Sequence, residues 1–117
     1  MDYKGIRVLL MDGYGRQIPT LLKQLHELGC IITTVNDSKL DVGYTSRYPK
    51  HRILIKGCRE NIDDLRAFVE KGLQMGDYDV IFPVLERSTD LMLMLQEDGK
   101  TKDVKVVCAP RESFIQA

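Results

Sequence analysis

Residues 6–29 read IRVLLMDGYGRQIPTLLKQLHELG, and this stretch predicts a strand, a glycine-bearing turn and a helix in succession. The run IRVLLM at 6–11 is almost continuously apolar, which is typical of a strand buried on both faces of a parallel sheet. Pro19 fits the first turn of the helix, and Gly29 fits the residue just past its end. The helix itself is indicated by apolar residues at helical spacing: Ile18, Leu21, Leu22, Leu25 and Leu28.

The rest of the chain repeats this alternation. Strands are expected at 30–35 (CIITTV), 52–55 (RILI), 78–84 (YDVIFPV) and 104–108 (VKVVC). Helices are expected after Asn61 and after Ser88, which both fit N-caps, and a last helix is expected to open at Pro110. The pattern predicts an α/β fold, a Rossmann-like doubly wound parallel five-stranded sheet of order 3-2-1-4-5 with helices on both faces.

The composition narrows the classes of partner. The 117 residues fit one domain, and 17 Lys and Arg balance 17 Asp and Glu, so the formal net charge is zero. A neutral chain gives no electrostatic reason to expect nucleic acid or an anionic membrane as partner. No apolar run is long enough to span a bilayer and no signal peptide precedes the first strand, so a cytoplasmic location is expected. Cys30, Cys58 and Cys108 show no metal-ligand spacing, and no metal site is expected.

Ligands of a doubly wound sheet bind beyond the carboxyl ends of the strands, where the strand order reverses. In the predicted order this point lies between the first and fourth strands. Gly13 and Gly15 match two of the three glycines of the G-x-G-x-x-G fingerprint, with Ile18 in place of the third. They fit either a phosphate held at a helix N-terminus or a tight turn that requires positive φ. Asp37 follows at about the distance of a ribose-binding acid, roughly 20 residues on.

Further candidates flank this turn. Arg16 and Gln17 add anion-binding groups to it. Glu86, after the fourth strand, fits either a cleft carboxylate or an acid favoured at a helix N-terminus. The long connection 37–50, DSKLDVGYTSRYPK, offers Ser46 and Arg47 for recognition or forms a solvated loop pinned by its tyrosines.

Two features of the C-terminal half bear on partners and on chain length: the apolar stretch 91–95 and the last predicted helix. The stretch LMLML at 91–95 is apolar almost all round, so another element is expected to cover that helix. A neighbouring domain or a second subunit, which would make a homodimer, are the two kinds of partner considered. The last helix stops without a cap at Ala117, which we interpret as a truncation of a longer chain.

Four stretches resemble the N-terminal domain of carbamoyl-phosphate-synthase-like ATP-grasp proteins. They are IRVLLMDGYGRQIPTLLKQLHELGC (6–30), DSKLDVGYTSRYP (37–49), YDVIFPVLERSTDLML (78–93) and VKVVCAPRESFIQA (104–117). The resemblance covers nearly the whole chain, and in that family the last stretch begins the helix that leads into the ATP-grasp fold. It implies that residues 1–117 are a pre-ATP-grasp domain, truncated at the start of that helix.

The resemblance also implies a function. The full-length protein would be an ATP-dependent carboxylate–amine ligase, or a carbamoyl-phosphate-synthase-like ligase, working through an acyl phosphate. ATP and magnesium would be bound by ATP-grasp domains absent here, and this fragment alone would be inactive. Its partners would be those domains and a small carboxylate or bicarbonate substrate. No residue of the chain is expected to be catalytic; the substrate-binding candidates are Gly13, Gly15, Arg16, Gln17, Asp37, Ser46, Arg47 and Glu86.

Two other functions remain open on the sequence. The partial glycine fingerprint and Asp37 fit a stand-alone Rossmann-type module that binds a nucleotide or NAD. The apolar stretch at 91–95 fits a regulatory or interaction domain.

Overall fold

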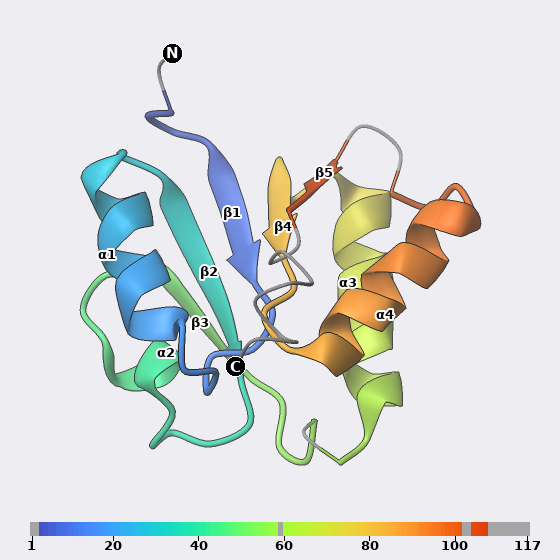
Figure 1. Ribbon diagram of the computed structural model, residues 1–117, viewed down its shortest axis with the longest axis horizontal. Coiled ribbons are helices and arrows are strands. Elements are labelled where there is room, and N and C mark those ends of the chain that lie inside the picture. Colours follow the sequence, from blue (N-terminus) through green and yellow to red (C-terminus); the bar gives the residue numbers. More distant parts are fainter. Residues whose placement is uncertain (1–2, 59, 102–103, 108–117) are drawn as a thin grey trace, which may run out of the picture.

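Strand β1 (Arg7–Leu10) lies at the centre of a five-stranded sheet of order β3-β2-β1-β4-β5, in which every neighbouring pair is parallel (Figure 1). The structure is a computed structural model that describes residues 3–58, 60–101 and 104–107. The predicted fold class and strand order are confirmed. The other elements are α1 (Ile18–Glu27), β2 (Ile31–Asn36), α2 (Val42–Thr45), β3 (His51–Leu54), α3 (Ile62–Met75), β4 (Val80–Phe82), α4 (Glu86–Glu97) and β5 (Lys105–Val106).

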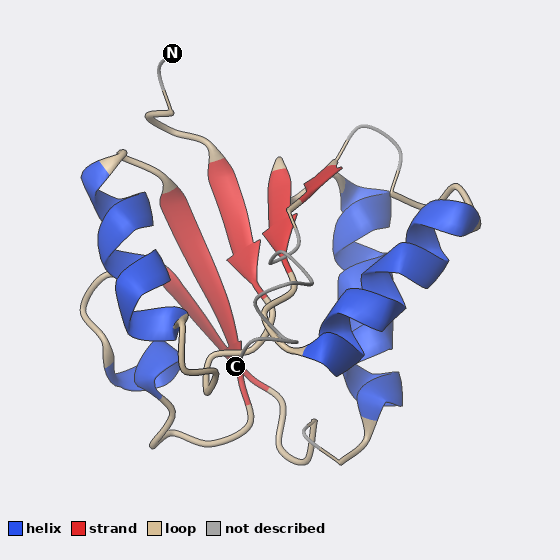
Figure 2. Cartoon of the chain, viewed as in Figure 1, coloured by secondary structure: helices blue, strands red, loops and turns tan. Residues whose placement is uncertain are grey.

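The sheet separates two layers of helices, with α1 and α2 on one face and α3 and α4 on the other (Figure 2). Along β1, Val8 and Leu10 pack in the cluster that contains α1, whereas Leu9 and Met11 pack in the cluster that contains α3 and α4. All four side chains are buried. Because both faces of the strand are covered, its residues after the exposed Arg7 are all apolar and do not alternate with polar ones.

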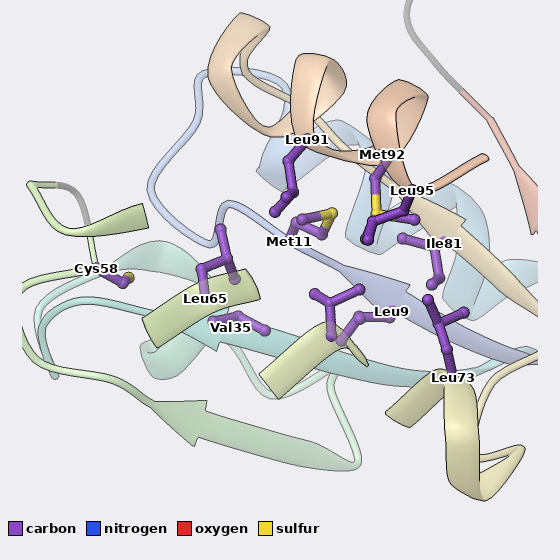
Figure 3. Packing of buried hydrophobic residues seen from close by; sticks show 11 residues of the cluster. Leu9, Met11, Val35, Cys58, Leu65, Leu73, Ile81, Leu91, Met92 and Leu95 are labelled. Atoms are coloured by element: carbon purple, nitrogen blue, oxygen red, sulfur yellow. The ribbon is translucent and has the colours of Figure 1, made fainter. Parts of the chain in front are cut away.

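The core on the α3 and α4 face explains the apolar stretch of α4. Leu91, Met92 and Leu95 are buried against side chains of β1, β4 and α3 (Figure 3). The element expected to cover this helix is therefore the core of its own domain. Met94 remains 38% exposed, so only a small part of the apolar stretch reaches the surface.

Three helix ends follow from local sequence. Asn61 caps α3 by accepting a hydrogen bond from the backbone N–H of Asp63 at 3.1 Å. Gly76 ends the same helix with φ of 69°, and Gly29 follows α1 with φ of 83°, both in the left-handed region that glycine adopts easily. The cap predicted at Ser88 is wrong, because α4 already begins at Glu86 and the Ser88 hydroxyl bonds instead to a distant carboxylate.

The elements also differ from expectation in extent. Each observed strand is shifted or shortened by one or more residues, and the connection 37–50 contains the one-turn helix α2 rather than loop alone. The helix expected from Pro110 lies outside the described residues. None of the helices in the described part of the chain is long and apolar enough to cross a membrane.

Candidate functional site at the carboxyl edge of the sheet

The buried carboxylate of Asp12 joins the ends of β1 and β4. Its Oδ2 accepts hydrogen bonds from the backbone N–H groups of Val84 at 3.0 Å and Leu85 at 2.9 Å. Its Oδ1 accepts one from the Ser88 hydroxyl at 2.7 Å. The side chain is 0% exposed, so these bonds replace all of its contact with water. Asp12 thus occupies the N-terminus of α4, where negative charge is favoured, and fixes β4 to β1.

A second tie joins the turn after β1 to β2 and α2. The backbone N–H of Gly13 donates to the carbonyl of Val35, and its carbonyl accepts from the N–H of Gly43, each at 2.8 Å. The Asn36 Oδ1 fills the space that a Cβ on either glycine would need. Both glycines are therefore required by close packing, and neither Gly13 nor Gly15 has positive φ. The expectation that this turn needs glycine for a positive φ is therefore wrong. Glycine is needed at Gly13 because a side chain there would collide with Asn36.

Asn36 is fully buried and partly satisfied. Its amide nitrogen donates to the Thr34 hydroxyl at 3.0 Å and to the carbonyl of Ile53 at 3.1 Å. The Thr34 hydroxyl in turn donates to the carbonyl of Gly43 at 2.6 Å. Asn36 Oδ1 is the one buried side-chain polar atom without a hydrogen-bond partner in the described residues. That oxygen lies where a Cβ on Gly13 or Gly43 would be placed.

The loops after β2 and β3 are tied by two more carboxylates. Asp41 Oδ2 accepts from the backbone N–H groups of Asp37 at 2.8 Å and Ser38 at 3.0 Å, which closes the turn before α2. Asp37 Oδ1 accepts from the backbone N–H of Gly57 at 2.6 Å, across to the loop after β3. The Asp37 carboxylate is therefore bound to the protein's own backbone.

The guanidinium of Arg87 connects the remaining two loops. Its Nη2 donates to the phenol oxygen of Tyr14 at 3.0 Å and to the carbonyl of Cys58 at 2.9 Å. Tyr14 lies in the turn after β1, Arg87 in the first turn of α4, and Cys58 between β3 and α3. Loops after β1, β3 and β4 meet at this one side chain.

The Cys58 thiol is fully buried beside these loops. The pKa of Cys58 is raised to about 11, chiefly by burial and also by the negative charge of Asp37, while the positive charge of Arg87 acts in the opposite direction. A thiol with such a pKa stays protonated at neutral pH and is a poor nucleophile. Cys58 is therefore a packing residue of the α3 and α4 core and brings no nucleophilic chemistry to the edge.

The structure places the candidate residues in two groups. Gly13 and Gly15 are buried in the turn after β1, with Arg16 and Gln17 exposed beside them at the start of α1. Glu86 is exposed in the first turn of α4, on the β4 side of the point between β1 and β4 at which the strand order reverses, which is the crevice position of doubly wound sheets in general. These five surround the point at which the strand order reverses.

Ser46 and Arg47 lie apart from that crevice, whereas Asp37 directly follows β2 at the carboxyl edge and its carboxylate binds the backbone of Gly57. The carbonyl of Ser46 accepts from the guanidinium of Arg52 on β3, and Arg47 lies over the Tyr48 ring at 5.5 Å. The Tyr48 ring contacts His26 in the last turn of α1, at 4.7 Å between ring centroids. Because α1 runs back from the carboxyl edge, Arg47 and Tyr48 lie toward the opposite edge of the sheet.

Sequence reasoning gave no role to Asp12, Tyr14 or Arg87. Arg87 directly follows Glu86 after the fourth strand, so its place at the carboxyl edge could be predicted from the sequence. Its hydrogen bonds to residues 29 and 73 positions away were not. The buried Asp12 was hidden in the same way, since its partners follow it by 72 to 76 positions.

A hollow of about 400 Å³ opens at the amino edge, away from this crevice. Arg7, one of its basic residues, is already paired with Asp79 through bonds of 3.0 and 3.2 Å. We place the candidate site at the carboxyl edge, because four loops converge there. The hollow is lined by Arg7, Ile31, Thr33, Lys50, His51, Ile53, Asp77 and Tyr78.

No protein-family model matches the chain, and no curated protein sequence matches it significantly. Within the described residues, no group of three or more His, Cys, Asp and Glu side chains is placed to hold a metal ion.

Proposed function

We propose that this chain is the N-terminal, substrate-side domain of an ATP-dependent ligase, of the carboxylate–amine or carbamoyl-phosphate-synthase-like kind. Two observations support the proposal. The sequence resembles such domains over nearly its whole length, and the chain has the Rossmann-like fold of order 3-2-1-4-5 that the resemblance implies. The fold alone is shared by many functions, so the argument for this one depends on the site.

The character of the carboxyl edge carries the proposal furthest. Asp12, Asp37 and Asp41 all bind backbone N–H groups, and the Cys58 thiol is buried. Groups bound to the backbone in this way hold the loops in place. The loops of this edge are thus tied together by hydrogen bonds, and polar side chains are exposed beside them. This arrangement suits a domain that positions a substrate while other domains perform the chemistry.

In such a ligase, a carboxylate or bicarbonate attacks the terminal phosphorus of ATP, and an acyl phosphate and ADP form. An amine then displaces phosphate from the acyl carbon. ATP and magnesium belong to the ATP-grasp domains, so no step of phosphoryl transfer is assigned to residues of this chain. Its part is to orient the acid or the amine at the β1–β4 crevice.

The alternative, a stand-alone nucleotide- or NAD-binding module, receives less support. Such a module needs open space beside the second glycine of the fingerprint, where the backbone approaches the pyrophosphate, and an acid that can bind the ribose. Here Asn36 and Val84 fill the spaces beside Gly13 and Gly15. The Asp37 Oδ1 is bound to the N–H of Gly57.

Trapping the acyl phosphate tests the proposal. An antibody raised against this chain isolates the native protein, which is then supplied with ATP, magnesium, hydroxylamine and a panel of carboxylates or bicarbonate. We expect ADP release and, with the correct organic acid, a hydroxamate, while the 117-residue chain alone gives neither. Saturable NAD or nucleotide-sugar binding by the chain alone, with no ADP release by the native protein, would overturn the proposal in favour of the alternative.

A further inference from the structure

Arg87, a cation at the carboxyl edge, donates the hydrogen bonds of its Nη2 to uncharged groups only. Its side chain is partly buried, and its two hydrogen-bond acceptors, the Tyr14 phenol and the Cys58 carbonyl, are both uncharged. No carboxylate within the described part of the chain forms an ion pair with it. A partly buried guanidinium has lost some of its hydration, and in the described residues no directly paired carboxylate replaces it.

Some donors of this guanidinium form no hydrogen bond to the described residues. Arginine carries five N–H donors, and the two bonds made by Nη2 leave about three on Nε and Nη1. Neither Nε nor Nη1 is among the buried polar atoms that lack a partner in the described residues. The tie to Tyr14 and Cys58 fixes the orientation of the group, so that its free donors are held in position before any ligand arrives.

The position of Arg87 is the second part of the argument. It lies in the first turn of α4, directly after β4, and its partner Tyr14 lies in the turn after β1. The order of the sheet reverses between these two strands, which is where ligands of doubly wound sheets bind. Arg16 is exposed on the β1 side of the same crevice and adds a second cation.

The acidic groups around Arg87 have other partners. Asp12, Asp37 and Asp41 contribute to the field at the neighbouring Cys58 thiol, so they lie in the same region. Each of them accepts hydrogen bonds from backbone N–H groups of the loops. Glu86 is exposed beside Arg87 and forms no ion pair with it.

From this geometry we infer that Arg87, oriented by Tyr14 and the Cys58 carbonyl, binds an oxyanion of the small-molecule substrate in the β1–β4 crevice. The oxyanion is a carboxylate or a phosphate group, since both match the donors of a guanidinium. The inference deepens the proposed function and rests on it for the statement that the anion belongs to a ligase substrate. The anion site itself rests on the geometry of Arg87.

Anion titration of the 117-residue chain, followed by NMR of its backbone amides and of the Arg87 Nε–H, tests the site directly. The probes are inorganic phosphate and acetate at constant ionic strength, with acetamide as the uncharged match of acetate. We expect saturable shifts at Tyr14, Cys58 and the Arg87 Nε–H with phosphate, acetate or both, and none with acetamide. The stronger of the two anions identifies the chemical group.

Arg87→Gln and Arg52→Gln form a matched pair of variants. Arg52 also donates to a neutral backbone carbonyl, that of Ser46, but it lies on β3 away from the crevice. Binding should weaken about tenfold or more in Arg87→Gln, the effect of losing a charge-assisted hydrogen bond, and should be unchanged in Arg52→Gln. Equal weakening in both variants, or shifts that grow linearly with anion concentration, would show a purely structural role for Arg87.

Two observations keep the test decisive. If Arg87→Gln does not fold, the Arg87 Nε–H of the wild-type chain still reports the contact, and a resonance unmoved by every anion overturns the inference. The ligase and the anion site can also fail separately. Anion binding without ADP release by the native protein removes the ligase alone, whereas ADP release with no anion effect on the Arg87 Nε–H removes the site alone.

Discussion

The side-chain oxygen of Asn36 occupies the space that a β-carbon on Gly13 would need. This packing explains the first glycine of the fingerprint without any phosphate. We predict that Gly13→Ala lowers the free energy of unfolding by about 2–3 kcal/mol, the range for overpacking a buried site. Urea denaturation measures the change.

The coupling between the two residues separates packing from other causes. In an Asn36→Ala background the space is open, so Gly13→Ala should cost less than about 1 kcal/mol. Gly15→Ala is the control, because its β-carbon meets a Val84 methyl at 3.0 Å that a side-chain rotation can move. A cost for Gly13→Ala that is the same in both backgrounds would contradict this role for Asn36.

Asp12 offers a second stability prediction. Asp12→Ala leaves the N–H groups of Val84 and Leu85 and the Ser88 hydroxyl without their acceptor, and should lower stability by roughly 3 kcal/mol. Asp12→Asn keeps an oxygen toward the two N–H groups and can donate to Ser88, so its loss should be nearer about 1 kcal/mol. Thermal unfolding of both variants and of the exposed control Glu97→Gln decides the point. Asp12→Ala as stable as Glu97→Gln would show that Asp12 does not join β1 to β4.

The thiol of Cys58 should react only when the protein opens. Burial raises its pKa to about 11, so we expect maleimide to modify it more slowly than the half-buried Cys30 at neutral pH. Peptide mapping by mass spectrometry after short exposures distinguishes the two. Equal rates in the absence of denaturant would contradict the burial of Cys58.

The same pKa shift predicts a dependence of stability on alkaline pH. An unfolded thiol loses its proton near about pH 8.5, whereas folded Cys58 keeps its proton until about 11. The native state binds more protons across that window, so the free energy of unfolding should fall as pH rises through it. Cys58→Ala should fall less steeply, with Cys30→Ala as control, and identical slopes for all three proteins would refute the prediction.

For the pair of Arg7 and Asp79, we predict that the free energy of unfolding rises with pH in the acid range, opposite to the effect of Cys58 in alkali. The Arg7 guanidinium lowers the pKa of the Asp79 carboxyl through a hydrogen bond, so stability from this pair is present above the unfolded pKa of about 4 and is lost as pH falls through the folded value. Both side chains are 45% exposed, so the effect should be small and weaker in high salt. Acid titration of urea midpoints for wild type, Asp79→Asn and the control Glu97→Gln measures it. An Asp79→Asn profile parallel to that of wild type would contradict the contribution.

The fold was predictable because its signals are local. The almost continuously apolar run at 6–11 indicated a strand covered on both faces, and Asn61 and Gly29 marked helix ends through their own backbone preferences. The order of the strands followed from alternating elements and right-handed crossovers.

The details of the carboxyl edge were not predictable for the same reason. Ser88 looks like an N-cap until the carboxylate of Asp12, 76 positions earlier, is seen to take its hydroxyl. Asp37 looks like a free ribose-binding acid until it is seen to bind Gly57, 20 positions later. The helix α2 is held by a bond between the N–H of Gly43 and the carbonyl of Gly13, which local propensity does not report.

If this domain serves a larger ligase, as we propose, the mass of the native gene product in its source cell will exceed that of this chain. An antibody raised against the 117 residues detects it on a denaturing gel. We predict a band that corresponds to several hundred residues, because in the proposed ligase the domains that bind ATP and magnesium follow on the same chain. A band that matches the 13.4 kDa of this chain would contradict the ligase and leave a small binding module.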